Sequence, residues 1–137
     1  MHGRILLVDD NVRGSLARKT VLEELGHSIH MASSGAEALE QFSQHKYDLV
    51  VTDYKMPRMD GLELIVRLRK QQPEIRIVLV SGFVDALGLC EASTGADAVI
   101  QKSANEVAHL VRAVNRLLRR KKPAAGAGAL KAKRQVG

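Results

Sequence analysis

Asp48-Leu49-Val50-Val51-Thr52-Asp53 is the stretch that decides the fold of this 137-residue chain. The four residues from Leu49 to Thr52 are aliphatic or β-branched, which is typical of a strand covered by helices on both faces. The stretch ends on the carboxylate of Asp53. Because ligands of open α/β sheets bind beyond the carboxyl ends of the strands, Asp53 is either a chemically active group or an acid that starts a turn.

Similar apolar segments alternate with helical patterns along the chain. We expect further strands at Arg4–Val8, 27–32, 75–80 and Ala98–Gln101. We expect helices after Asn11, after Ser34, after Gly61, over 83–93 and after Ser103 or Asn105. Five such units predict a parallel sheet with helices on both faces, which is a three-layer α/β fold.

The inward faces and the ends of these helices follow from spacing and capping residues. The first helix is expected to bury Leu16, Leu22, Leu25 and either Thr20 or Val21. The last is expected to bury Val107, Leu110, Val111, Val114, Leu117 and Leu118. Asn11 and Ser34 are predicted N-caps, and Gly26 and Pro73 are predicted to end their helices.

The composition limits the class of protein. Cys90 is the only cysteine, so no disulfide can form within the chain. The segment before Ile5 is too short and polar for a signal peptide, and no apolar run approaches the roughly 18 residues that span a membrane. We therefore expect a cytoplasmic protein.

The net charge of +6 is concentrated at the C-terminal end. Residues 121–137 contain five basic side chains and no acid, whereas residues 1–120 contain 16 basic and 15 acidic side chains. We expect one domain over 1–120 and a disordered basic Ala/Gly/Lys tail over 121–137. The tail is either a solvated extension or a weak, non-specific binder of nucleic acid, and its lack of aromatic side chains and of a recognition helix favours the first.

Polar side chains follow four of the predicted strands. Asp9 and Asp10 follow the first strand, Asp53 ends the third, and Ser81 and Lys102 follow the fourth and fifth. Each of these residues alone has an ordinary structural explanation, but their coincidence at one edge of the sheet predicts a site. Carboxylates that lie close together repel one another unless a cation sits between them, and hard oxygen ligands suit Mg²⁺.

Phosphoryl chemistry suits this set of residues. A carboxylate such as Asp53 can act as a nucleophile toward phosphorus. The ammonium of Lys102 and the hydroxyl of Ser81 match the oxygens of a phosphoryl group. Magnesium and Lys102 would stabilise the charge that develops during an in-line transfer.

The chain resembles the receiver domains of bacterial two-component response regulators, and is similar in extent to the single-domain chemotaxis regulator. The resemblance covers residues 4 to about 120. It rests on Ile5-Leu6-Leu7-Val8-Asp9-Asp10-Asn11, Asp48-Leu49-Val50-Val51-Thr52-Asp53, Met56-Pro57-Arg58-Met59-Asp60-Gly61, Ser81-Gly82, and Gly95-Ala96-Asp97 running to Lys102. It implies a flavodoxin-like sheet of five strands in the order 2-1-3-4-5 with five helices.

The resemblance also implies a role for each site residue. Asp53 would accept a phosphoryl group from the phosphohistidine of a sensor histidine kinase or a phosphotransfer protein. Asp10, Asp53 and the backbone carbonyl of Lys55 would ligate Mg²⁺, and Asp9 would act through water. The Ser81 hydroxyl would move toward the phosphoryl group, and Lys102 would pair with it.

The implied function is a regulatory phosphoacceptor and not an enzyme, with slow self-dephosphorylation only. Phosphorylation would change the binding of a downstream protein. Receivers often pair through the fourth and fifth helices, so the chain is either a monomer or a homodimer. The alternative is a Mg²⁺-dependent phosphohydrolase that works through an aspartyl phosphate. Such enzymes typically have a second acid two residues after the nucleophile, where this chain has Lys55.

The chain departs from the family pattern at two positions. Ser103 follows the lysine where the family usually has a proline with a cis bond, so we expect a trans bond or a less rigid loop here. Val99 stands where the family usually has Tyr or Phe, whose ring turns inward upon switching. Signalling through that ring is therefore not available to this chain.

Overall fold

A single parallel sheet forms the centre of the molecule. The computed structural model describes residues 2–82 and 87–119. In these residues the strands are β1 (Arg4–Val8), β2 (Ser28–Ala32), β3 (Leu49–Asp53), β4 (Arg76–Ser81) and β5 (Ala98–Gln101), all paired in parallel. Their order is β2-β1-β3-β4-β5, so the predicted fold class is confirmed.

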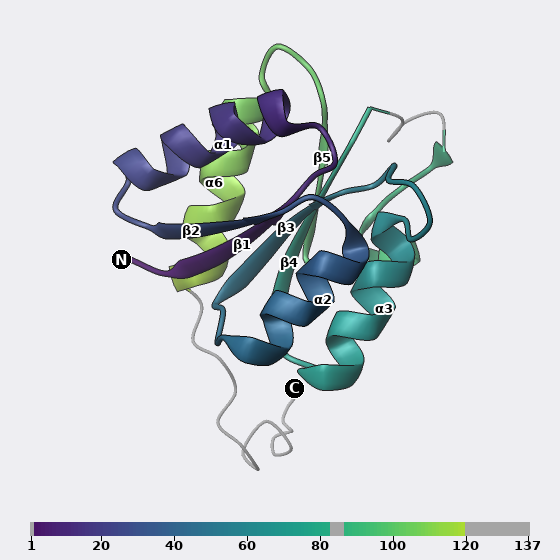
Figure 1. The fold of residues 1–137 in the computed structure, drawn as a ribbon. Helices are drawn as coiled ribbons and strands as arrows, with labels where there is room; N and C mark the ends of the chain where they lie inside the picture. Colours follow the sequence, from purple (N-terminus) through teal and green to yellow (C-terminus); the bar gives the residue numbers. More distant parts are fainter. Residues whose placement is uncertain (1, 83–86, 120–137) are drawn as a thin grey trace, which may run out of the picture.

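Helices cover both faces of the sheet (Figure 1). The described helices are α1 (Val12–Glu24), α2 (Gly35–Gln44), α3 (Gly61–Gln71), α5 (Glu91–Thr94) and α6 (Glu106–Arg119). The helices α1 and α6 lie on one face, and α2 and α3 lie on the other. Each of these five helices is too short or too polar to cross a membrane.

Two aliphatic cores fill the space between the layers. One core joins alternate strand residues such as Leu7 and Val51 to Leu22 of α1 and Leu117 of α6. The other joins the intervening strand residues to α2 and α3, where Leu64 is completely buried. Because both faces of β3 are buried, the continuous apolar run of this strand is explained.

Side-chain caps begin the helices as predicted. Asn11 Oδ1 accepts hydrogen bonds from Arg13 N and Gly14 N at the start of α1. Ser34 Oγ accepts from Glu37 N at the start of α2. Both N-caps are confirmed, and they fix where the chain leaves the carboxyl ends of β1 and β2.

The predicted inward faces of α1 and α6 need correction. Leu16 and Leu25 are 49% and 41% exposed, and Val107 is 40% exposed. The buried residues of α1 are Ser15, Arg18 and Leu22, which follow one another at helical spacing. An arginine occupies the inward face because Asp9, just after β1, and Glu106 of α6 neutralise it. The leucines on either side therefore turn toward solvent.

The single helix predicted over 83–93 is also wrong in the part that can be checked. Residues 83–86 lie outside the described residues, and so do residues 120–137 with the expected basic tail. Gly88 has a φ of 64°, a left-handed conformation that ends a helix. A separate short helix, α5, begins only after Cys90, whose backbone is extended.

Candidate functional site

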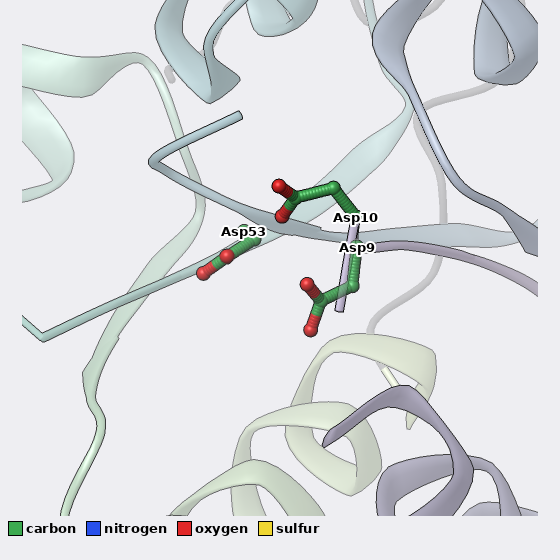
Figure 2. A group of neighbouring side chains, drawn as sticks. All are labelled: Asp9, Asp10 and Asp53. Atoms are coloured by element: carbon green, nitrogen blue, oxygen red, sulfur yellow. The ribbon is translucent and has the colours of Figure 1, made fainter. Parts of the chain in front are cut away.

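Three carboxylates meet at the carboxyl ends of β1 and β3. Val8 pairs with Thr52 in the sheet, so the residues that follow, Asp9 and Asp53, emerge side by side. Asp9, Asp10 and Asp53 each place a carboxylate oxygen within 4.8 Å of the others (Figure 2). Asp9 and Asp53 are only 2% and 5% exposed, whereas Asp10 is exposed.

The electrostatics of this cluster favour a cation. Burial raises the pKa of Asp53; the hydrogen bond from Lys102 opposes this change and the nearby Asp9 adds to it. The cost of keeping Asp53 ionised falls when a cation lies among the acids. The donors are all hard oxygens, which fit Mg²⁺ and do not fit metals that prefer sulfur.

Lys102 lies directly against Asp53. Its Nζ is 2.8 Å from Asp53 Oδ1, and its side chain is about one-third exposed. The lysine follows β5, and its backbone N–H donates to the Ser81 carbonyl at 2.9 Å. The structure therefore brings together Asp53 and Lys102, which lie 49 positions apart in the sequence, as the strand-end argument predicts.

Ser81 and Lys55 complete the set of predicted site residues. Ser81 is the last residue of β4, which neighbours β3, and is 1% exposed. Lys55 follows Asp53 by two residues and is exposed. The roles assigned to the Ser81 hydroxyl and the Lys55 carbonyl remain predictions.

The loop between β3 and α3 holds the backbone of Asp53 in place. Gly61 N donates to the Tyr54 carbonyl at 2.7 Å. A Cβ atom at Gly61 would lie 2.5 Å from the Asp53 carbonyl oxygen and 2.9 Å from Leu79 Cδ1. Asp60 caps α3 by accepting a hydrogen bond from Glu63 N. The Asp60-Gly61 pair thus has a structural reason, because only a residue without a side chain lets α3 start this close to Asp53.

One buried residue near the site was not predicted from the sequence. Arg18 of α1 is 5% exposed and places Nη1 2.6 Å from Asp9 Oδ2. Its Nε lies 2.6 Å from Glu106 Oε2 of α6. Burial lowers the pKa of Arg18, but the hydrogen bonds that Arg18 donates to Glu106 and Asp9 outweigh this effect, so the pKa is raised. The signal in the sequence is its spacing, three residues after Ser15 and four before Leu22.

The two departures from the family pattern are visible in the structure. The described residues contain no cis peptide bond, so the bond between Lys102 and Ser103 is trans, in line with one of the two expectations. Val99 is partly buried and packs against the α2/α3 core. The side chain at this position therefore has no aromatic ring that could turn inward.

Comparison with known proteins places these observations in a family. The model of the family described as "Response regulator receiver domain" matches residues 5–115. A gliding motility regulatory protein of Myxococcus xanthus is 34% identical over 119 residues, which are 83% of this chain and 15% of that protein. The sensor kinase CckA of Brucella abortus is 39% identical over 83 residues, which are 59% of this chain and 9% of that protein. The chain thus spans only a small part of these relatives.

Two solved structures match this chain over nearly their full length. The response regulator protein TrrA from Thermotoga maritima, in complex with Mg(2+)-BeF, is 34% identical, with a TM-score of 0.75 over 83% of this chain and 97% of that one. The receiver domain of the Francisella response regulator 1452 is 31% identical, with a TM-score of 0.78 over 88% of this chain and 99% of that one.

Proposed function

The chain belongs to the response regulator receiver domain family, and on this premise we propose that Asp53 is the residue that accepts the phosphoryl group. A receiver domain is a phosphoacceptor module of two-component signalling rather than a catalytic enzyme, and it is phosphorylated on an aspartate with the help of Mg²⁺. The observation that carries the proposal is the 2.8 Å ion pair between Lys102 and the buried Asp53, next to two further carboxylates.

The transfer itself is a substitution at phosphorus. An ionised oxygen of Asp53 forms the new P–O bond while the P–N bond to the donor imidazole breaks, and the electron pair of that bond leaves with the imidazole. Lys102 lies where its ammonium can neutralise charge on the phosphoryl oxygens. The Ser81 hydroxyl, at the end of the neighbouring strand, would donate to one of those oxygens afterwards.

Asp10, Asp53 and the backbone carbonyl of Lys55 would hold Mg²⁺, with Asp9 acting through water. When bound, the ion neutralises the carboxylates and the phosphoryl oxygens. The protein's own contribution is to keep these oxygens together on strand ends that the two cores fix. The burial of Asp9 and Asp53 limits how far the two side chains can separate when the ion is absent.

The proposed phosphodonor is a sensor histidine kinase or a phosphotransfer protein in the cytoplasm. Receiver domains receive the phosphoryl group from histidine kinases. Val12 and Leu16 of α1 are 56% and 49% exposed, and they follow Asp10 closely in the chain. Exposed apolar side chains beside the site suit a docking protein. A downstream protein or a second copy of the chain would respond to the phosphorylated state, and the domain would end near residue 120.

Labelling by a small phosphodonor tests the acceptor. The full chain, incubated with acetyl phosphate and Mg²⁺ and measured by intact-mass spectrometry, should gain a single phosphoryl group. Asp53→Asn should gain none. Asp48→Asn is the matched control, because Asp48 precedes the same strand at its other end and accepts a hydrogen bond from Arg4 N. Undiminished labelling of Asp53→Asn would contradict the assignment, and continuous release of phosphate would favour the phosphohydrolase.

A further inference from the structure

Arg18 is shared between the metal site and α6. Its Nη1 donates to Asp9 Oδ2 and its Nε donates to Glu106 Oε2, both at 2.6 Å. Figure 2 shows the Asp9 side chain directed toward α1 and α6, while Asp10 points the other way. The arginine is 5% exposed, so water screens neither ion pair strongly. One guanidinium therefore pairs with two acids, one at the end of β1 and one in α6.

Both carboxylate oxygens of Asp9 accept a hydrogen bond from the protein. Its Oδ1 accepts a hydrogen bond from Asn11 N at 2.8 Å, and its Oδ2 accepts from Arg18. On the other side of the cluster, Lys102 neutralises Asp53. Each cation lowers the negative potential that attracts a divalent metal. The Arg18 contact is the more buried of the two, since Lys102 is about one-third exposed.

We propose that Arg18 is a positioning residue that competes with Mg²⁺ for Asp9, and that Glu106 sets the strength of this competition by holding Arg18 toward α6. The inference rests on the proposed metal site, where Asp10 and Asp53 hold the ion and Asp9 acts on it through water. With Glu106 in place, part of the arginine's charge is directed away from Asp9, and the site binds metal more tightly. Without Glu106, the guanidinium pairs with Asp9 alone, and the site binds metal more weakly.

This competition links the metal site to α6 without an aromatic switch. Since the effects of two sites on each other are reciprocal, a bound metal that engages Asp9 through water shifts Arg18 toward Glu106. Conversely, any partner that draws Glu106 away from Arg18 lowers the metal affinity. The chain has Val99 where a ring would otherwise respond, so the path through Arg18 and Glu106 gives α6 its own connection to the site.

A purely structural ion pair predicts a different pattern. Removing either partner of a buried pair destabilises the fold, so a structural role would have Arg18→Met and Glu106→Gln act in the same direction. Competition for Asp9 instead requires effects of opposite sign on metal affinity. It also requires that Glu106 acts only through Arg18.

Metal affinity can be measured without any phosphorylation, by electron paramagnetic resonance of free Mn²⁺ titrated with the full chain and competed with Mg²⁺. We expect Arg18→Met to bind Mn²⁺ on the order of tenfold more tightly, because a unit charge beside the site is removed. Glu106→Gln should bind on the order of threefold more weakly. The double variant should match Arg18→Met. Arg67→Met is the control and should match the wild type, because Arg67 pairs with Glu63 on the exposed face of α3.

Each outcome decides one point. No Mn²⁺ binding by the wild type would refute the proposed metal site itself. The wild type could bind Mn²⁺ while Arg18→Met and Glu106→Gln both change the affinity in the same direction or leave it unchanged. That result would refute the competition and leave the metal site standing. If Glu106→Gln still weakens Mn²⁺ binding in the Arg18→Met background, the charge of Glu106 acts on the metal directly and not through Arg18. That result would also refute the competition. If circular dichroism shows Arg18→Met unfolded, Glu106→Gln and Arg18→Lys carry the test, and Glu106→Gln binding as tightly as the wild type would overturn the proposal.

Discussion

Replacing Gly61 with alanine should loosen the phosphoacceptor strand end. The new Cβ would lie 2.5 Å from the backbone oxygen of Asp53 and 3.0 Å from Tyr54 Cα. The Asp53 contact must lengthen by about 0.8 Å to reach an ordinary carbon–oxygen distance. The nearest atom belongs to the backbone of β3 and cannot rotate aside, although another neighbour, Leu79 Cδ1 at 2.9 Å, is a side-chain atom that can shift.

The cost follows from two contributions. Overpacking of this kind costs about 1–3 kcal/mol. The 2.7 Å hydrogen bond from Gly61 N to the Tyr54 carbonyl lengthens as α3 moves away, which adds about 1 kcal/mol. We therefore expect Gly61→Ala to lose about 2–4 kcal/mol of the free energy of unfolding, which lowers the urea midpoint by about 1–2 M.

Gly82→Ala is the matched control. Gly82 follows the neighbouring strand β4, and a Cβ there meets no atom within 4 Å among the residues that the structure describes. This variant should stay within about 0.5 kcal/mol of the wild type. The rate of labelling by acetyl phosphate should fall on the order of tenfold or more in Gly61→Ala, because Asp53 is displaced. Wild-type stability together with a wild-type labelling rate in Gly61→Ala would refute the reasoning.

Three further predictions concern other contacts of the site and the fold. Lys102→Met should slow the labelling of Asp53 on the order of tenfold or more, yet change the free energy of unfolding by less than about 1 kcal/mol, because its ion pair is partly exposed; equal labelling rates would contradict this. Burial lowers the pKa of His27 from 6.5, and His27 Nδ1 accepts a hydrogen bond from Gly3 N. The stability that the neutral ring contributes is therefore complete above about pH 6.5 and declines as the pH falls below it. Urea titrations of the wild type should give a lower free energy of unfolding at about pH 5.5 than at about pH 7.5. This difference should be smaller in His27→Gln. Arg69→Met should cost about 2–4 kcal/mol in urea unfolding, because Arg69 donates five hydrogen bonds to the segments that follow α3 and α5; Arg67→Met, which breaks only an exposed pair, should cost less than about 1 kcal/mol.

The strand ends could be predicted because backbone pairing, and not side-chain detail, places them. Once β1, β3, β4 and β5 are recognised as parallel strands, their final residues must meet at one edge of the sheet. The 2.8 Å contact of Lys102 with Asp53 is the direct result. The caps at Asn11 and Ser34 were equally predictable, since they depend only on neighbouring residues.

Arg18 could not be predicted by the same means. An arginine between leucines on a helix normally faces solvent, so the spacing predicts Leu16 and Leu25 in the core instead. Its burial requires two acids, and Glu106 lies 88 positions away on another helix. Only the tertiary arrangement of α1 against α6 brings that partner close. The break at Gly88 was missed because a single glycine inside an apolar pattern does not by itself show that the chain turns left-handed.

The central claim is that Asp53 carries the phosphoryl group, and chemical trapping tests it most directly. The full chain is labelled with acetyl phosphate and Mg²⁺, reduced with borohydride so that an aspartyl phosphate becomes homoserine, and digested for peptide mass spectrometry. The account predicts homoserine at position 53 and unchanged aspartate at positions 9 and 10. Homoserine at either of those positions, with Asp53 intact, would contradict it.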